Sequence, residues 1–425
     1  MSIRDDVINM KKVAPVMAGS SIDIRNKALL LIKDSLKNNK DKIFEENKRD
    51  MDNATASGID DAVLGRLKFD EGKLSSVLDG IDMLIGLEDP IGKVSLKREL
   101  DEDMTLTRIS CPIGVIGIIF EARPDALVQI STLCVKSGNC AILKGGRETA
   151  NTNRALFDII HEAVVTAGLP DNSMKLATTH SEIDEMLNCE GYVDLIIPRG
   201  SNAFVQYIMN NTRIPVMGHA DGICHIYVDE HADIDMALKI IKDAKLQYTA
   251  ACNSVETILV HKSIADTFIT RLKEYMNENK VCLHADDELA DRYGLSHLPE
   301  KGYIEYLSPD ASVKVVESIE EAVEHINTHG SHHTDSIITD CDRNAEYFMS
   351  MVDSAGVYRN CSTRFADGFR YGFGAEVGIS TSKLHARGPV GLDGLVTYKY
   401  TLTGNGNIVA DYAEGRRQFK YKELI

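Results

Sequence analysis

The chain of 425 residues contains 44% hydrophobic and 26% charged residues, which is ordinary for a globular protein and is enough for two or three domains with buried cores. Its formal net charge of −17 disfavours general binding to nucleic acid or to anionic membranes. No apolar run reaches the ~18 residues of a membrane span, and residues 1–6 lack the apolar core of a signal peptide. We therefore expect a cytoplasmic protein with no membrane and no nucleic-acid partner.

In chain order, the pattern predicts helices over residues 1–92 and then a β-hairpin over 94–109, where alternating residues flank the acidic turn 101–103. After the hairpin the pattern predicts strands at 114–120, 140–144 and 194–198, helices at 125–136 and 149–167, and a further helix opening at Ser201. This alternation predicts a parallel sheet covered by helices on both faces.

A second series of strands and helices begins near residue 224. It has predicted strands at 224–228 and 255–260 and predicted helices at 234–246 and 263–277. From Val396 on, the last thirty residues turn polar and β-like. They hold too little apolar surface for a domain of their own, so we expect an arm that packs on another part of the protein.

The turn that presents Cys252 carries the strongest chemical signal. Small residues precede the cysteine, and the predicted strand at 255–260 supports it from behind. A thiolate is the strongest side-chain nucleophile near neutral pH, and an ordinary thiol with a pKa of about 8.5 needs only modest help to ionise. The nine cysteines are scattered without a CxxC pair, which suits a reducing compartment rather than a disulfide framework. From this segment alone, a buried inert cysteine is an equally good interpretation.

Two glycine-containing turns each follow a predicted strand and precede a predicted helix. Glycine lets the backbone approach a ligand, and a helix N-terminus attracts phosphate. Two such turns at the carboxyl edge of one sheet suit a dinucleotide, although each alone is also an ordinary βα turn. The residues concerned are Lys144, Gly145 and Arg147 in the first turn and Arg199, Gly200 and Ser201 in the second.

The segment 359–388 is basic within an acidic chain, with five basic residues against two acidic ones. This balance favours a pocket for a small anionic ligand, and the alternative is a solvated loop with chance arginines. The glycines at 372–378 do not match a GxGxxG fingerprint, so we interpret them as a packed loop. The histidines of 329–333 have no ligand set at a recognised spacing, which predicts a solvent-facing turn and no metal site.

Several blocks together resemble a known family. The chain is similar to the gamma-glutamyl phosphate reductases, which are glutamate-5-semialdehyde dehydrogenases of the aldehyde dehydrogenase superfamily, and the similarity covers nearly the whole chain. The blocks are CPIGVIG at 111–117 with EARP at 121–124, DLIIPRGS at 194–201, HADGICHIYVD at 219–229, CNSVETILV at 252–260, and the long ungapped block at 360–391.

The resemblance implies an α/β fold of the aldehyde dehydrogenase type. It implies a Rossmann-type NADP-binding domain over 1–96 and 111–228, and an α/β catalytic domain over 229–395 that carries the cysteine nucleophile. It also implies a small β oligomerisation element, in which the hairpin 97–110 pairs with the C-terminal arm 396–425. This element explains both isolated β segments.

The resemblance also implies the reaction. The family uses NADPH to reduce L-glutamyl 5-phosphate to L-glutamate 5-semialdehyde and phosphate in L-proline biosynthesis. Cys252 maps onto the nucleophile that forms a thioester, and its backbone N–H together with Asn253 would stabilise the oxyanions. Lys144 maps onto the adenosine-side lysine, and Glu305 onto the ribose-binding glutamate.

The anionic groups of such a substrate would need cations or hydroxyls. The basic segment offers most of them, and we allow that at least one of its four candidate cations instead holds the loop through an ion pair with Asp367 or Glu376. By the resemblance, the position of the superfamily's oxyanion asparagine falls at Ala122, beside Arg123, and the oxyanion donor that replaces it stays open. The expected substrate-binding residues are Arg123, Ser362, Thr363, Arg364, Arg370, Lys383 and Arg387.

Val216 marks a departure from ordinary aldehyde dehydrogenases. Their Glu-Leu-Gly-Gly-Lys stretch carries the base that hydrolyses the thioester, and residues 216–220 of this chain replace that glutamate with valine. The loss favours reduction over the alternative of a hydrolytic NAD(P)-dependent dehydrogenase for a small anionic aldehyde. A catalytically inactive scaffold is opposed by Cys252 and the basic segment. The resemblance further implies a homo-oligomer formed through the C-terminal arm and functional coupling to glutamate 5-kinase.

Overall fold

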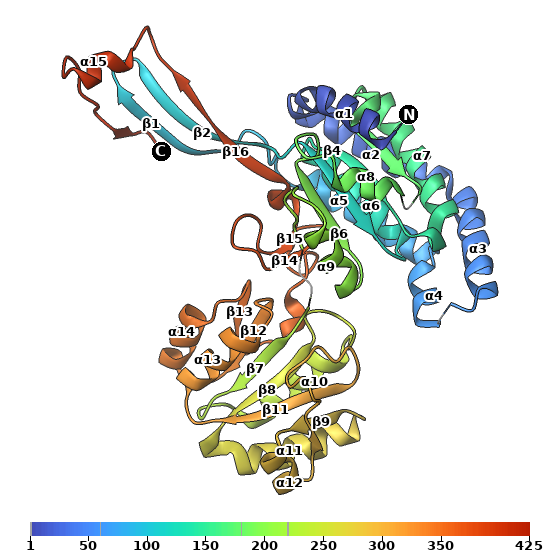
Figure 1. Ribbon diagram of the computed structural model, residues 1–425, viewed down its shortest axis with the longest axis vertical. Coiled ribbons are helices and arrows are strands. Elements are labelled where there is room, and N and C mark those ends of the chain that lie inside the picture. Colours follow the sequence, from blue (N-terminus) through green and yellow to red (C-terminus); the bar gives the residue numbers. More distant parts are fainter. Residues whose placement is uncertain (1, 60, 180, 219–220) are drawn as a thin grey trace. The chain divides into compact units, whose positions relative to one another are not determined.

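The computed structural model of the protein describes residues 2–59, 61–179, 181–218 and 221–425 (Figure 1). The chain forms two compact units. The first comprises Met1–Met217, Phe373–Gly378 and Val390–Ile425, and the second comprises Gly218–Gly372 and Ile379–Pro389. The division falls after Met217 rather than after residue 228, so the strand at 224–228 belongs to the second unit. Among the described residues, no helix is long and apolar enough to cross a membrane.

The N-terminal part of the first unit is helical, as the sequence pattern predicted. Side-chain caps fix three of the helix starts, since Ser2 accepts from Asp5 N, Ser21 accepts from Ile24 N and Asp70 accepts from Lys73 N. The helices over 3–18, 22–38 and 71–86 bury a mainly apolar stripe, as an amphipathic pattern requires, whereas the helix over 40–56 buries Asn47 and Asp50 beside Ile43 and Ala54. The helices of this part are α1 (Ile3–Ala18), α2 (Ile22–Asn38), α3 (Lys40–Ala56), α4 (Asp61–Leu67) and α5 (Glu71–Gly86).

A four-stranded parallel sheet in the order β5-β4-β3-β6 forms the centre of the first unit. The strand order changes direction between β3 and β6, and ligands of such sheets bind where the carboxyl ends of these strands meet. The elements are β3 (Val115–Phe120), β4 (Cys140–Lys144), β5 (Met174–Ala177), β6 (Leu195–Arg199), α6 (Pro124–Lys136), α7 (Ala150–Ala167), α8 (Ser181–Leu187), α9 (Asn202–Asn210), and the 3-10 turns η1 (Arg147–Thr149) and η2 (Asp171–Ser173).

The predicted hairpin pairs with the C-terminal arm in a second, antiparallel sheet of the first unit, ordered β16-β2-β1-β17 (Figure 1). The pairing of β16 with β2 runs from Val396 opposite Pro112 to Thr403 opposite Thr105. This confirms both the hairpin and the partner expected for the arm. The elements are β1 (Val94–Asp101), β2 (Met104–Pro112), β16 (Val396–Thr403), α15 (Val409–Ala413), β17 (Lys422–Glu423) and the 3-10 turn η5 (Leu392–Leu395).

The second unit contains a seven-stranded sheet in the order β10-β9-β11-β8-β7-β12-β13, with every pairing parallel. Its strands are β7 (Cys224–Val228), β8 (Val255–His261), β9 (Cys282–Ala285), β10 (Ser296–His297), β11 (Asp310–Val316), β12 (Thr334–Ile338) and β13 (Gly356–Arg359). Its helices are α10 (Ile234–Leu246), α11 (Ala265–Glu278), α12 (Asp287–Tyr293), α13 (Ile319–His329) and α14 (Asp342–Met351), with the 3-10 turns η3 (Lys262–Ile264) and η4 (Thr363–Phe365). The short strands β14 (Gly378–Ser380) and β15 (Gly388–Val390) pair with each other where the chain passes between the units.

Alternate residues of the central strands pack on opposite faces of this sheet. Ile226 and Ile258 join the apolar cluster that contains residues of α10 and α11. Tyr227 and Leu259, their chain neighbours, join the cluster that contains residues of α13 and α14. Both faces are therefore buried, which explains why β7 and β8 read as continuous apolar runs rather than as alternating ones. The turn that precedes β8 is held by this rigid core.

Candidate active site

Cys252 lies in the turn between α10 and β8 and is partly buried. Its backbone is tightly fixed. A Cβ placed on Gly222 would come within 2.0 Å of the Cys252 carbonyl oxygen, so only glycine permits this approach of the two chain segments. The Cys224 thiol also lies 3.4 Å from the same carbonyl oxygen. The cysteine is therefore presented on a rigid support, as the sequence pattern predicted.

Burial makes most of the other cysteines less reactive than a partly buried thiol such as Cys252, because it raises their thiol pKa. It raises the pKa of Cys134 and of Cys140 to about 12, and it raises the pKa of Cys224 well above its ordinary value. Burial also raises the pKa of Cys189 and Cys361. These five thiols are held in the protonated form, which is neither nucleophilic nor reactive.

His333 is the main site residue that the sequence interpretation missed. Its Nε2 lies 3.3 Å from Sγ of Cys252, and its side chain is buried. The prediction that residues 329–333 form a solvent-facing turn is wrong for this residue, because it directly precedes β12, which pairs with β7 in the interior of the sheet. Only the long-range parallel pairing of β12 brings residue 333 to residue 252, and no local pattern reports such a pairing.

Two hydrogen bonds join the basic segment to the cysteine turn. The Thr363 hydroxyl donates to the carbonyl of Asn253 at 2.7 Å, and the Asn253 side-chain amide donates to the carbonyl of Ala366 at 2.7 Å. Ser362 caps η4 by accepting from the backbone N–H of Arg364. The amide of Asn253 thus anchors η4, a structural contact that its predicted oxyanion role did not anticipate.

Arg364, in η4, is a cation of the basic segment whose charge interacts with Cys252. Its guanidinium is largely buried, donates to Oε1 of Gln247 at 2.9 Å, and interacts electrostatically with Cys252. Burial and the neighbouring Arg370 lower the pKa of Arg364, whereas Cys252 raises it. Arg370 donates to the Arg364 carbonyl at 2.9 Å and lies 3.5 Å from Asp367.

Two further cations of the basic segment bind a carboxylate of the protein itself. Lys383 lies 2.5 Å and Arg387 lies 3.0 Å from the carboxylate of Asp353. Hydrogen bonding from Lys383 lowers the pKa of Asp353. The structural ion pairs allowed for this segment therefore exist, with Asp353 and Asp367 as the acids, while Glu376 pairs instead with Arg199. Arg123, in the first unit, is exposed at the start of α6.

In the first unit, Lys144 ends β4 and is largely buried, with Nζ donating to the Gly145 carbonyl at 2.6 Å. Burial lowers the pKa of Lys144, while Glu148 and Glu182 raise it. Gly145 is required by packing, since its Cβ would lie 2.1 Å from Nδ2 of Asn153. Arg147 is exposed in η1. The first predicted turn therefore presents one buried and one exposed cation at the carboxyl edge of the sheet.

The second predicted turn already holds an anion. At the N-terminus of α9, the carboxylate of Glu121 accepts from the backbone N–H of Ser201 at 3.1 Å. A Cβ on Gly200 would lie 2.5 Å from the same carboxylate, and Arg199 lies 3.6 Å from Glu376. Both glutamates lie in the first unit, so the positive end of α9 is neutralised from within that unit.

Two residues mapped by resemblance fall in less regular segments. Glu305 is partly buried between β10 and β11, and its charge raises the pKa of Glu256, behind the main effect of burial. Val216 forms an isolated bridge with Ile196 beside β6. The rest of its predicted stretch includes His219 and Ala220, which lie outside the described residues.

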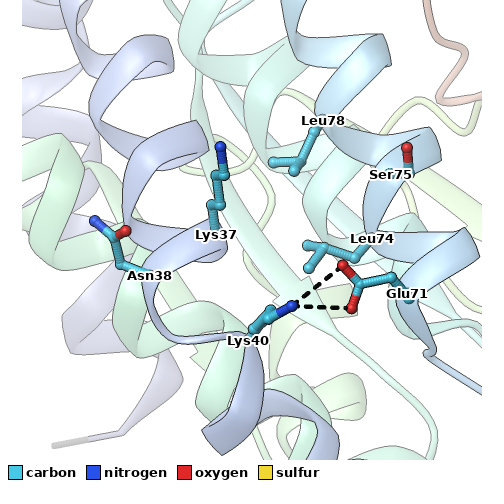
Figure 2. Close-up of a pocket in the computed structure, with 7 residues that line it drawn as sticks. All are labelled: Lys37, Asn38, Lys40, Glu71, Leu74, Ser75 and Leu78. Atoms are coloured by element: carbon cyan, nitrogen blue, oxygen red, sulfur yellow. Dashed lines mark hydrogen bonds and ion pairs between the residues drawn. The ribbon is translucent and has the colours of Figure 1, made fainter.

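Other clusters of the described residues do not resemble an active site. A surface hollow in the first unit, between α2, α3 and α5, contains the Lys40–Glu71 ion pair but neither a cysteine nor a histidine (Figure 2). In the second unit Cys282, His284 and Asp310 place potential metal-ligand atoms within 4.8 Å of one another. The His284 ring binds the Asp310 carboxylate at 2.8 Å and Cys282 binds Ser296, so these groups pair within the protein.

Known proteins are similar to this chain in both fold and sequence. The model of the aldehyde dehydrogenase family matches residues 3–290. A crystal structure of gamma-glutamyl phosphate reductase from Thermotoga maritima superposes with a TM-score of 0.93 at 34% identity, covering 96% of this chain and 100% of that chain. The corresponding structure from Saccharomyces cerevisiae gives a TM-score of 0.56 at 39% identity, covering 97% and 100%. The protein thus has the aldehyde dehydrogenase fold, as predicted, and carries a cysteine on the turn before β8.

The similarity extends to complete sequences. A gamma-glutamyl phosphate reductase of Acetivibrio thermocellus is 54% identical over 425 residues, which is 100% of this chain and 99% of that protein. The chain belongs to the aldehyde dehydrogenase family, and within it to the gamma-glutamyl phosphate reductases. The predicted enzyme class, an oxidoreductase of the glutamate-5-semialdehyde dehydrogenase type, is confirmed.

Proposed function

We propose that the protein uses NADPH to reduce L-glutamyl 5-phosphate to L-glutamate 5-semialdehyde and phosphate, through a thioester on Cys252, in L-proline biosynthesis. The observation that carries the proposal is the attachment of the basic segment to the cysteine turn by the Thr363 and Asn253 hydrogen bonds. That attachment supports an anionic acyl substrate at the thiol. The names of the full-length relatives support the same reaction.

In this mechanism the Cys252 thiolate attacks the acyl carbon, and phosphate leaves with the bonding electron pair. Arg364 stabilises the negative charge on the phosphate, because a largely buried guanidinium interacts strongly with an anion. The backbone N–H of Cys252 stabilises the oxyanion. The valine at position 216 supplies no carboxylate to activate water, which supports reduction of the thioester over its hydrolysis.

The first unit has the type of sheet and the type of charged residue that a nicotinamide dinucleotide site requires. Its parallel sheet has a switch point between β3 and β6, and Lys144 ends β4 at the same edge with a buried ammonium group. Lys144, Gly145 and Arg147 would hold the adenosine end of the cofactor, with Gly200 and Ser201 at the switch point. The ribose contact of Glu305, which belongs to the second unit, rests on the resemblance alone. When bound, the cofactor supplies the hydride that reduces the thioester carbonyl.

The reverse assay tests this function most directly. Glutamate semialdehyde, phosphate and NADP are expected to give NADPH at a rate that depends strictly on phosphate, because phosphate must release the acyl group from Cys252. Turnover without phosphate, with free glutamate as the product, would contradict the proposal and favour the hydrolytic dehydrogenase.

We predict a preference for NADPH over NADH that depends on Arg147. This exposed cation can pair with a 2′-phosphate without loss of folding contacts, so Arg147→Ala is expected to lower kcat/KM for NADPH about tenfold while that for NADH stays nearly constant. Arg154→Ala, which removes another exposed cation of the same region, is the matched control. Equal losses with both cofactors, or equal efficiency in the unmodified protein, would contradict the assignment.

We predict that Arg364 dominates anion binding and that Lys383 contributes little. Arg364→Lys keeps the charge but loses the planar guanidinium, so the KM for phosphate or for glutamate semialdehyde is expected to rise about tenfold or more. Lys383→Ala, at an exposed side chain paired with Asp353, is expected to change these constants less than about twofold. A larger effect at Lys383 than at Arg364 would place the anion elsewhere. The remaining members of the predicted set, including Arg123, Arg370 and Arg387, belong in the same series.

We also propose assembly of a homo-oligomer through the C-terminal arm. β16 is the terminal strand of its sheet, and the side chains of Tyr398, Tyr400 and Leu402 are 56%, 55% and 58% exposed. An open edge strand with apolar side chains favours pairing with another chain. Functional coupling to glutamate 5-kinase, which makes the labile acyl phosphate, is part of the same proposal.

A further inference from the structure

We infer that His333 is the general base and acid of this site: it takes the proton of the Cys252 thiol, which then attacks as the thiolate, and returns that proton to the departing phosphate. The inference rests on the proposed function for the identity of the leaving group, and on geometry for the proton transfer. It assigns a catalytic role to a residue that the sequence interpretation had placed on a solvent-facing turn.

The geometry is that of a cysteine–histidine pair. Nε2 of His333 lies 3.3 Å from Sγ of Cys252, within hydrogen-bonding range for sulfur. Nδ1 lies 2.9 Å from the hydroxyl oxygen of Thr334. A hydroxyl oxygen can accept from Nδ1–H, which leaves the Nε2 lone pair directed at the thiol. Thr334 is therefore a positioning residue for the tautomer that a base requires.

The backbone around His333 is equally fixed. Gly356 donates to the His333 carbonyl at 3.0 Å, and Ala355 donates to the His332 carbonyl at 3.0 Å. Both bonds extend the pairing of β12 with β13 toward the cysteine turn. On the other side, Gly222 and Cys224 fix the backbone of Cys252. Neither partner of the pair can move far, so the contact is preorganised before substrate binds.

The charges around the pair favour an ionised thiol. Arg364 interacts with Cys252 from η4 and contributes positive charge. Cys224, on β7, is held protonated by burial and adds no charge. The carboxylate of Asp335, on β12, is bound by His225 and by Ser354. A thiolate near a guanidinium and an imidazolium is the arrangement that activates cysteine nucleophiles.

The proton balance closes over the reaction. The S–H bond breaks first, with the proton moving to Nε2 of His333, and the resulting thiolate Sγ then bonds to the acyl carbon. The bond between the acyl carbon and the phosphate oxygen then breaks, and the imidazolium gives its proton to the phosphate. After reduction of the thioester the C–S bond breaks, and the released thiolate takes a proton that His333 draws from water. The full cycle consumes one proton.

Alkylation of the resting enzyme tests the pair without any substrate. The rate at which iodoacetamide modifies Cys252 is followed by mass spectrometry of the Cys252 peptide across about pH 6 to 10, in the unmodified protein and in His333→Gln. The variant is expected to lose at least about tenfold of the rate near pH 6.5 and to approach the unmodified protein above about pH 9, where an ordinary thiol ionises unaided. Its turnover is expected to fall about 10²- to 10⁴-fold.

His332→Asn is the matched control, because His332 is the chain neighbour of His333, has a positive φ of 59° that asparagine tolerates, and binds the Asp353 carbonyl instead of the thiol. His332→Asn should leave the alkylation profile and the turnover unchanged. Thr334→Val should lower the alkylation rate near pH 6.5 by less than His333→Gln does. An alkylation profile of His333→Gln equal to that of the unmodified protein would overturn the inference, whatever the substrate is. Persistent turnover in a Cys252 variant would instead overturn the proposed function.

Discussion

Replacing Cys252 with alanine is expected to abolish turnover, by at least about 10³-fold, while the fold and cofactor binding survive. Without the thiolate no thioester can form, and the remaining groups of the site offer no other nucleophile on this turn. Cys252 is only partly buried in the turn before β8, so removal of one sulfur atom leaves little unfilled volume. The measurement is kcat in the reverse assay, with the melting temperature and NADP affinity recorded for the same protein.

Cys282→Ser is the control for this experiment, because Cys282 is the exposed cysteine of the second unit and its thiol contacts Ser296. It is expected to retain activity within about twofold. If Cys252→Ala kept more than a small fraction of the activity while Cys282→Ser lost it, the nucleophile would be misassigned.

Replacing Lys245 with methionine is expected to destabilise the second unit by about 3–5 kcal/mol. Lys245 on α10 and Glu256 on β8 are both fully buried, and their charged groups lie 2.7 Å apart. Burial raises the pKa of Glu256, and Lys245 opposes this rise. Without the lysine, a carboxylate in the apolar interior has lost its counter-charge. The free energy of unfolding, followed by denaturant titration of the second unit's transition, measures the loss.

The pH dependence of this variant has a definite sign. With its pKa raised in the folded state, Glu256 binds a proton more tightly there than in the unfolded chain, so stability falls as pH rises above the unfolded value of about 4.3. The loss in Lys245→Met is therefore expected to be larger near pH 8 than near pH 5. The double variant Lys245→Met with Glu256→Leu should recover most of the stability, because it removes both charges together. A loss below about 1 kcal/mol, or one independent of pH, would contradict this account.

The buried pair of Lys245 and Glu256 also lies next to the cysteine turn in the chain. Glu256 accepts from the backbone N–H of Tyr306 at 3.2 Å, and Ser254 binds the carbonyl oxygen of Ala244 at 3.2 Å on α10. The same short stretch of chain thus carries the nucleophile, a helix contact and the buried charge. We expect Lys245→Met to lower activity in proportion to the folded fraction, and not through KM.

The predicted substrate-binding residues show which features of the site the sequence can predict. The +3 balance of residues 359–388 led to the prediction of an anion-binding segment, because charge is a local property of the sequence. The structure shows that this segment contacts the cysteine turn through Thr363, and its binding of an anion stays a prediction. The sequence could not predict which cations of the segment form ion pairs within the protein, because Lys383 and Arg387 pair with Asp353, an acid outside the segment. Likewise, the helix N-terminus at Ser201 was recognised from its glycine and hydroxyl, but the carboxylate of Glu121 that occupies it comes from the end of a different strand.

The sequence by itself determined the family, the parallel α/β organisation, the hairpin and the position of Cys252, because each depends on periodicity or on contiguous residues. The pairing of the hairpin with the C-terminal arm was implied only by the family resemblance. Only the tertiary structure decided the surroundings of the thiol. Gly222, His333 and Thr363 reach residues 252–253 from three segments far apart in the chain, through strand order and close backbone packing. Contacts of this kind follow from how β7, β8 and β12 pair, and a pairing between distant strands leaves no periodic signal in any one of them.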